Sequence, residues 1–295
     1  MNFRENRILI KRNSYVLNQI QDKLRILLFY LLKIFPINKK KIVIQCFKDM
    51  GYCDSLKYIC EELLHQKVDY QIVWITKKKY INQFPNAIKL VPVNTFRAIK
   101  ELATAKIWID NCRTDSWVRK RTGQFYLQTW HNGISLKKVE GEAEKVLSES
   151  YLKSAKNDSK MIDVFLSDSD LATDRIRNSF WYSGKILKFG LPKNDIFFYY
   201  PDVSFTKKIK HKVSAHLGIP FENRILLYAP TFRKDFSTAS YLTDYKDIIP
   251  ILNRDKKWTI VEHFHPNVQH FNTKYTHSEG TINADNYEDL QELLL

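Results

Sequence analysis

The chain has 295 residues, of which 44% are apolar and 27% are charged. This length allows two domains of ordinary size, and the composition excludes disordered and fibrous proteins. Lys and Arg total 47 against 32 Asp and Glu, so the formal net charge is +15. An excess of this size favours an anionic partner: a nucleic acid, a phosphorylated metabolite or an acidic membrane.

Residues 1–41 carry more than half of this positive charge. They contain ten basic and two acidic side chains, which gives a net charge of +8. The apolar stretch 24–35 is interrupted by cations and is shorter than the roughly 20 apolar residues that span a bilayer. Such a segment is typical of an amphipathic helix on an anionic membrane surface. The alternative is a helix that packs on the following domain with its cations in solvent.

From residue 41 onward, short apolar runs alternate with helical patterns. We expect strands at 41–47, 70–76, 88–93, 106–110, 124–130, 164–168 and 185–190, and helices at 55–66, 95–103, 142–155 and up to about 180. This alternation predicts βαβ units in a mainly parallel sheet. Ligands bind such sheets beyond the carboxyl ends of the strands.

A turn-rich junction at 190–195 precedes a second α/β unit. There we expect helices at 205–217 and 245–253, strands at 224–229, 258–265 and 281–284, and a final helix at 287–295. The final helix would present four leucines with no later strand to bury them, so this unit is expected to be incomplete. The predicted division is a basic amphipathic segment at 1–40, a first domain at 41–195 and a partial second domain at 196–295.

The strongest candidate for chemistry is His131, which directly follows the apolar run 124–130. Imidazole titrates nearest neutral pH and can remove a proton from a hydroxyl group. Gly133 would let the backbone approach a ligand, and Lys137 and Lys138 could face phosphate oxygens. The alternative is a histidine that bonds locally at the strand end, with both lysines in solvent.

Two further candidates follow predicted strands of the second unit. Thr231 offers a hydroxyl group, and Arg233 offers a guanidinium fork that matches phosphate geometry. Strand alternation would place His263 and His265 on one face, but no third metal ligand is evident nearby. We therefore expect no metal, and favour contact between one of these histidines and an anion.

Four motifs, in this order, resemble the CDP-glycerol glycerophosphotransferase family of teichoic-acid and capsule biosynthesis. They are Gln-x-Trp-His…Gly…Lys-Lys at 128–138, Gly-x-Pro-x-Asn-Asp at 190–195, Tyr-Ala-Pro-Thr-Phe-Arg at 228–233 and His-Pro-Asn at 265–267. The resemblance runs from residue 41 to the last residue. It implies an α/β fold of glycosyltransferase B type, in which two Rossmann-like domains enclose a donor cleft.

The resemblance also implies an activity: transfer of glycerol phosphate or ribitol phosphate from a CDP-activated donor to a hydroxyl of a membrane-linked polymer. His131 matches the family's general base, and His265 matches the histidine that meets the donor phosphates. The residues implied to bind substrate are Gly133, Lys137, Lys138, Asn194, Asp195, Thr231 and Arg233. Lys193 stands where the family usually has arginine. No cofactor is implied.

The family continues beyond the segment that matches 287–295 with a motif that completes the donor site. We therefore expect a C-terminally truncated member, and the alternative function is an inactive remnant that binds membrane or acidic polymer. The implied partners are a CDP-polyol, a lipid-linked acceptor polymer and the cytoplasmic face of the cell membrane. Nucleic acid is not an expected partner, because more than half of the excess charge lies beside a long aliphatic run.

Overall fold

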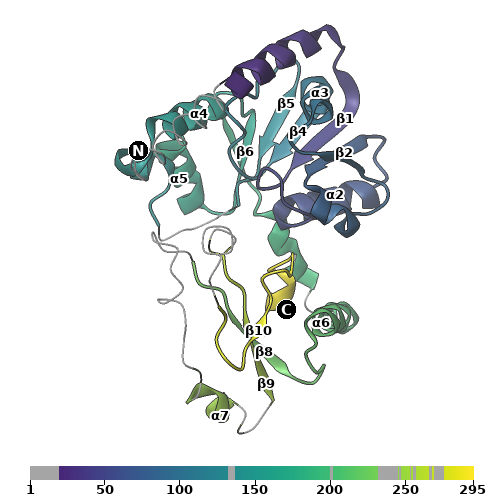
Figure 1. Cartoon of the computed structure of the whole chain (residues 1–295), viewed down its shortest axis with the longest axis vertical. Coiled ribbons are helices and arrows are strands. Elements are labelled where there is room, and N and C mark those ends of the chain that lie inside the picture. Colours follow the sequence, from purple (N-terminus) through teal and green to yellow (C-terminus); the bar gives the residue numbers. More distant parts are fainter. Residues whose placement is uncertain are drawn as a thin grey trace, which may run out of the picture. The chain divides into compact units, whose positions relative to one another are not determined.

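The computed structural model describes residues 20–131, 137–199, 202–231, 245, 247–252, 254, 257–265, 268 and 276–295. Its internal contacts divide the chain into two units, Met1–Lys193 and Asn194–Leu295 (Figure 1). The boundary predicted from the sequence falls between residues 195 and 196.

The first unit is built on a seven-stranded sheet with the order β3-β2-β1-β4-β5-β6-β7. All its neighbouring strands run parallel. The order reverses between β1 and β4, and the crevice at such a reversal is the usual ligand site of an open parallel sheet. The strands are β1 (Asn38–Gln45), β2 (Gln71–Thr76), β3 (Lys89–Pro92), β4 (Ala105–Asp110), β5 (Phe125–Gln128), β6 (Val164–Ser167) and β7 (Lys185–Lys188).

Alternating side chains of the strands fill two cores, one on each face of the sheet. Ile72 and Trp74 of β2 pack on the face covered by α2, whereas Val73 and Ile75 pack on the face that α3 and α5 help to cover. This period of two follows from the pleat of a strand. The helices of this unit are α2 (Asp54–His65), α3 (Phe96–Thr104), α4 (Glu149–Ser159) and α5 (Asp170–Ser179), with 3₁₀ turns η1 (Leu32–Ile34), η2 (Lys78–Gln83), η3 (Glu140–Val146) and η4 (Pro192–Tyr199), the last of which continues into the second unit.

The single helix expected at 142–155 is wrong, because this stretch forms η3 and α4 as separate elements. Ser148 interrupts them with an extended backbone (ψ 148°), and its side chain accepts a hydrogen bond from Tyr151 N. Serine in this role satisfies an amide at the helix start and favours a new helix over continuation of the preceding turn.

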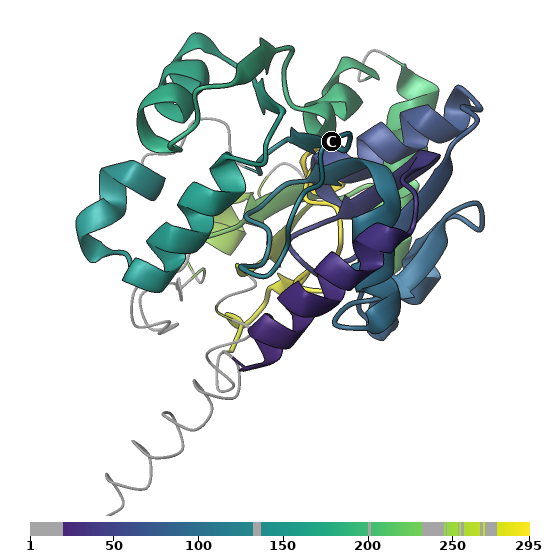
Figure 2. The same cartoon turned by 90° about the horizontal axis from the view of Figure 1, so that it is seen from above.

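The helical segment 20–31 packs against the first unit through one face only (Figure 2). Phe29 and Leu32 are buried in the core beside α3. The opposite face exposes an apolar stripe at helical spacing: Ile20, Leu24, Leu27, Leu31 and Ile34, each between 50% and 81% exposed. Among the described residues, no helix combines the length and the apolar character needed to cross a membrane.

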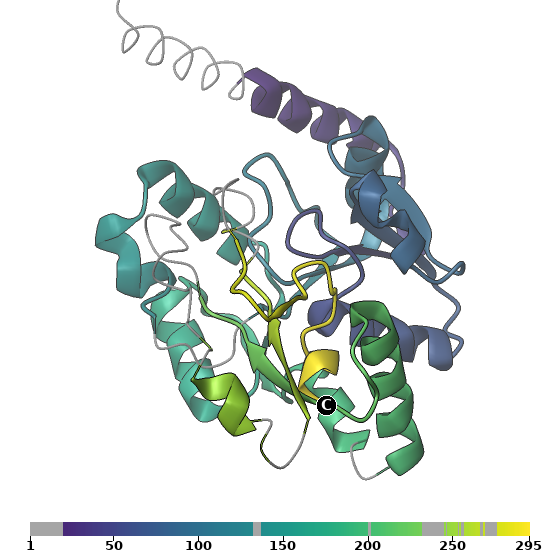
Figure 3. The same cartoon turned by 60° about the horizontal axis from the view of Figure 1, so that its bottom comes forward.

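The second unit has a three-stranded parallel sheet, β10-β9-β8. Helices α6 and α7 flank β8 and β9 on opposite sides (Figure 3). Gly218 ends α6 in the left-handed conformation (φ 66°) that glycine adopts most easily. The elements are α6 (Val203–Leu217), β8 (Arg224–Tyr228), α7 (Ile248–Leu252), β9 (Trp258–Glu262), β10 (Ile282–Asn283) and η5 (Glu292–Leu294).

The helix predicted at 287–295 is wrong: only η5 forms there. Asp289 Oδ1 accepts a hydrogen bond from Gln291 N, a local turn that competes with a helix. Tyr287 and Leu293 are buried in the core around Val261. Leu293 and Leu290 therefore pack on strands already present, contrary to the expectation that the leucines lack a partner, whereas Leu294 stays 57% exposed.

Candidate functional site

His131 lies at the carboxyl end of the sheet, three residues after β5 ends at Gln128. Its neighbours come from the segments that follow β1 and β4, of which β4 is adjacent to β5. Phe47 follows β1, Asp54 begins α2, and Asn111 directly follows β4. This is the edge, next to the reversal of strand order, at which the sequence predicts ligand binding.

One ring nitrogen of His131 is held by the backbone. His131 Nδ1 lies 2.8 Å from the carbonyl oxygen of Asn111. Because a carbonyl oxygen can only accept, the neutral imidazole carries its hydrogen on Nδ1 and leaves the lone pair on Nε2. No described residue bonds to Nε2. The ring stacks on Trp130 at 4.6 Å and contacts the Phe47 ring at 5.2 Å.

The surroundings of His131 favour its neutral form. Burial lowers the pKa of the imidazole below its ordinary value of 6.5, and the charge of Lys193 acts in the same direction. The bond to Asn111 and the charge of Asp54 raise the pKa but are outweighed. A histidine with a lowered pKa and an unprotonated Nε2 is ready to accept a proton at neutral pH.

A polar network behind His131 fixes its backbone. Lys193 Nζ donates to the His131 carbonyl oxygen at 2.6 Å and to Asp54 Oδ2 at 3.1 Å. Asn111 Nδ2 donates to Asp54 Oδ1 at 3.1 Å, and Asn111 Oδ1 accepts from Phe47 N at 2.7 Å. Sequence analysis did not predict Asp54, Asn111 or Lys193 as site residues. The available signals were the position of Asn111 directly after a predicted strand and the place of Lys193 in the motif at 190–195; Asp54 had only its position at the start of a predicted helix.

Backbone strain gathers around the same strand ends. Phe47, Lys48, Asp54 and Trp130 all have φ between 43° and 70°, a region that residues other than glycine rarely occupy. Each such residue costs of order 1–3 kcal/mol and persists only where its surroundings impose it. Strain of this kind concentrates at functional sites, so it supports the assignment of the site.

A buried ion cluster lies beside Trp130, the residue on which His131 stacks. Arg113 donates to Glu140 Oε2 at 2.9 Å and to Asp158 Oδ2 at 3.1 Å. Its guanidinium carbon lies 5.6 Å from the centre of the Trp130 ring. Arg113, Glu140 and Asp158 are each 6% exposed or less. The cluster therefore anchors the segment that carries His131.

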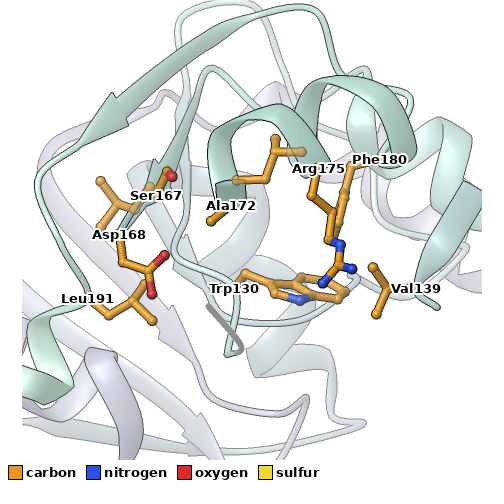
Figure 4. A pocket seen from close by; sticks show the side chains of 10 residues that line it. Trp130, Val139, Ser167, Asp168, Ala172, Arg175, Phe180 and Leu191 are labelled. Atoms are coloured by element: carbon orange, nitrogen blue, oxygen red, sulfur yellow. The ribbon is translucent and has the colours of Figure 1, made fainter. Parts of the chain in front are cut away.

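A small pocket lies on another side of Trp130. Its walls are mainly apolar, with Phe180 and Leu191 among the lining side chains. Figure 4 shows the Asp168 carboxylate and the Arg175 guanidinium on opposite sides of this pocket. Arg175 Nε donates to Glu142 Oε1 at 3.2 Å.

The second unit contains a histidine held between two carboxylates. His277 Nδ1 lies 2.9 Å from Glu262 Oε2, and its Nε2 lies 2.9 Å from Asp285 Oδ2. Asp285 Oδ1 also accepts from Phe264 N at 2.6 Å. This cluster ties down the turn after β9, which contains the predicted site residue His265.

The other predicted site residues are placed as follows. Lys137 and Lys138 are exposed, and Thr231 lies three residues after β8. Asn194 and Asp195 lie in η4, whereas Gly133 and Arg233 fall outside the described residues. Their roles in binding stay predictions.

The expectation that strand alternation sets the positions of His263 and His265 is wrong, because β9 ends at Glu262. His263 N donates the last bond of the ladder to the carbonyl oxygen of Tyr228 in β8, and His265 lies beyond the end of the strand. Within the described ranges, no three His, Cys, Asp or Glu side chains are arranged to hold a metal ion.

Solved structures share this architecture. A variant of the wall teichoic acid polymerase TagF matches with a TM-score of 0.75 and 23% identity over 99% of this chain and 73% of that chain. The same variant soaked with CDPG matches with a TM-score of 0.76 and 24% identity, at the same coverage. The predicted fold class is confirmed: the chain is an α/β protein with a glycosyltransferase B-like fold.

The model of the family CDP-Glycerol:Poly(glycerophosphate) glycerophosphotransferase matches residues 27–295. The chain belongs to this family, as the four motifs indicated. It is 29% identical to the teichoic acid glycerol-phosphate transferase of Staphylococcus aureus, over 90% of this chain and 69% of that protein. It is 26% identical to the teichoic acid poly(glycerol phosphate) polymerase of Staphylococcus epidermidis, over 88% of this chain but only 37% of the polymerase.

Proposed function

We propose that the chain transfers glycerol phosphate from CDP-glycerol to a hydroxyl group of a membrane-linked teichoic-acid or capsular polymer. Membership of the family and the relatives named above support the donor and the transferred group. His131 acts as the general base, and ribitol phosphate from CDP-ribitol is the alternative transferred group.

The observation that carries this proposal is the state of His131. Its Nδ1 is engaged by the Asn111 carbonyl oxygen at 2.8 Å, so the basic lone pair lies on Nε2. Burial keeps the pKa of the ring below 6.5 and the ring neutral. A base positioned in this way contributes about 10²–10⁴-fold to rate.

In the proposed reaction the acceptor hydroxyl displaces CMP from the phosphorus that carries glycerol. Nε2 takes the proton of the acceptor hydroxyl as its oxygen bonds to the phosphorus that carries glycerol. The bond from that phosphorus to the bridging pyrophosphate oxygen breaks, and CMP leaves with the electron pair. Charge develops on the leaving phosphate, and cations stabilise such charge. His265, Thr231 and Arg233 are the residues we assign to the donor.

The membrane-linked acceptor is supported by the helical segment 20–31. The exposed stripe from Ile20 to Ile34 lies within residues 1–41, whose net charge is +8. An apolar stripe flanked by cations favours the surface of an anionic bilayer. We assign the chain to the cytoplasmic face of the membrane as a peripheral protein.

The test is CMP release from CDP-glycerol, with a lipid-linked acceptor in membrane vesicles, for the wild type and His131→Ala. We expect the variant to lose about 10²–10⁴-fold in rate. His65→Asn is the matched control, because His65 is exposed on α2 and 84% of its side chain is accessible. CDP-ribitol in place of CDP-glycerol distinguishes the two polyols. Absence of CMP release from the wild type would instead support the inactive remnant.

A further inference from the structure

Lys193 joins two segments of the site that lie far apart along the chain. Its ammonium group donates to the carbonyl oxygen of His131 at 2.6 Å and to Asp54 Oδ2 at 3.1 Å. Only 14% of the Lys193 side chain and 9% of the Asp54 side chain are exposed. A charged group shielded from water is stable only when it is paired and hydrogen-bonded. These two contacts are therefore a built part of the site, unlike those of a lysine in solvent.

Both acceptors of Lys193 belong to strained backbone. Asp54 has φ 57°, and Trp130, which directly precedes His131, has φ 54°. Residues other than glycine keep such angles only where the surrounding contacts impose them. One ammonium group thus holds both strained segments, and its loss would leave the backbone of His131 free to relax.

The charged side chains that act on the His131 ring come from three elements. They are Asp54 at the start of α2, Glu140 in η3 and Lys193 in η4. Burial is the main cause that lowers the pKa of the ring; the charge of Lys193 adds to it, whereas Asp54 and Glu140 act in the opposite direction. Glu140 is paired with Arg113 at 2.9 Å. Without Lys193, the ring would face the Asp54 carboxylate with no cation beside it.

We propose that Lys193 is a positioning residue for the reaction: it fixes the backbone of His131 and pairs with Asp54, so that this carboxylate does not act alone on the ring. The role rests on the proposed function, in which His131 is the base. Arginine can perform both tasks, because its guanidinium group stays charged and donates several hydrogen bonds. An uncharged side chain of similar length can perform neither.

The test is a pH titration of the whole chain by NMR that follows the ring signals of its eight histidines. His131→Asn assigns the His131 signal. In Lys193→Met we expect the His131 ring to bind its proton about tenfold more tightly, because the Asp54 carboxylate then favours imidazolium. The midpoint of the titration therefore moves to higher pH. Lys193→Arg should keep the midpoint of the wild type.

Two variants at Asp54 keep the test decisive if Lys193→Met does not fold. Asp54→Asn retains the bond from Lys193 to the His131 backbone but removes the negative charge, so the midpoint should move to lower pH. The double variant Lys193→Met with Asp54→Asn leaves no unpaired charge, and its midpoint should return most of the way to that of the wild type. Lys188→Met is the matched control, because Lys188 pairs with Asp170 at 2.6 Å but is 52% exposed.

The pH dependence of CMP release gives a second readout. The rate loss in Lys193→Met should be largest at low pH and should shrink as the pH rises, because higher pH restores neutral His131. A residue with a merely structural role would reduce the rate by the same factor at every pH. Lys193→Arg should restore the rate.

The two readouts separate this proposal from the proposed function. An unchanged His131 midpoint in Lys193→Met or in Asp54→Asn, an equal shift in Lys188→Met, or a shift in Lys193→Arg as large as in Lys193→Met would overturn the role of Lys193. A chain that shows all the expected midpoints but releases no CMP would refute only the transferase.

Discussion

Replacement of Arg113 by Met would remove the cation at the centre of the buried cluster beside Trp130. Arg113 is 5% exposed and donates to four partners: Glu140, Asp158, Ser159 Oγ at 2.8 Å and the Phe180 carbonyl oxygen. Met keeps much of the side-chain volume but leaves two buried carboxylates without a counter-charge.

The expected loss of folding stability follows from these two unpaired buried carboxylates. Removal of one partner from a buried ion pair destabilises a protein by about 3–5 kcal/mol. Arg113 serves two carboxylates, so the loss should reach the upper part of that range. In a unit of this size 1 kcal/mol shifts the melting temperature by about 2–4 °C. We therefore expect a decrease of roughly 10–20 °C.

Urea unfolding followed by circular dichroism would measure this loss, with Arg177→Met on the exposed face of α5 as control. The control should change stability by less than about 0.5 kcal/mol. A triple variant that also carries Glu140→Gln and Asp158→Asn removes the unpaired charges and should recover much of the loss. A loss below about 1 kcal/mol in Arg113→Met, or a triple variant as unstable as the single one, would refute the reasoning.

Two other predictions concern activity and location. The rate of CMP release should fall as pH decreases through a pKa below 6.5, because burial lowers the pKa of His131 and only its neutral form accepts a proton. An acidic decrease in the pH–rate profile that is centred above pH 6.5 would contradict this. For the same reason, the stability that neutral His131 contributes is present above pH 6.5 and is lost as pH decreases. Leu27→Gln on the exposed stripe should weaken binding to vesicles rich in phosphatidylglycerol by about tenfold in a sedimentation assay. Ile81→Gln, at an apolar position in η2 that is 44% exposed against 57% for Leu27, should not weaken it.

Much of the first unit could be predicted from local pattern. A run such as Ile72 to Ile75 is short, apolar and β-branched, and its two faces pack into different cores because a strand alternates. Prediction failed where a local hydrogen bond competed with a helical pattern. Ser148 starts a new helix inside 142–155, and Asp289 forms a turn inside 287–295. The spacing of apolar residues carries no information on side-chain hydrogen bonds of this kind.

The sequence alone determined that His131 follows a strand of a parallel sheet, and therefore that it lies on the edge where ligands bind. Only the tertiary structure decided which ring nitrogen is basic and what holds the residue in place. Asn111 lies 20 residues from His131 in sequence, and Lys193 lies 139 residues from Asp54. These partners meet because parallel strands bring their carboxyl ends together regardless of distance along the chain, and no local pattern specifies such pairings.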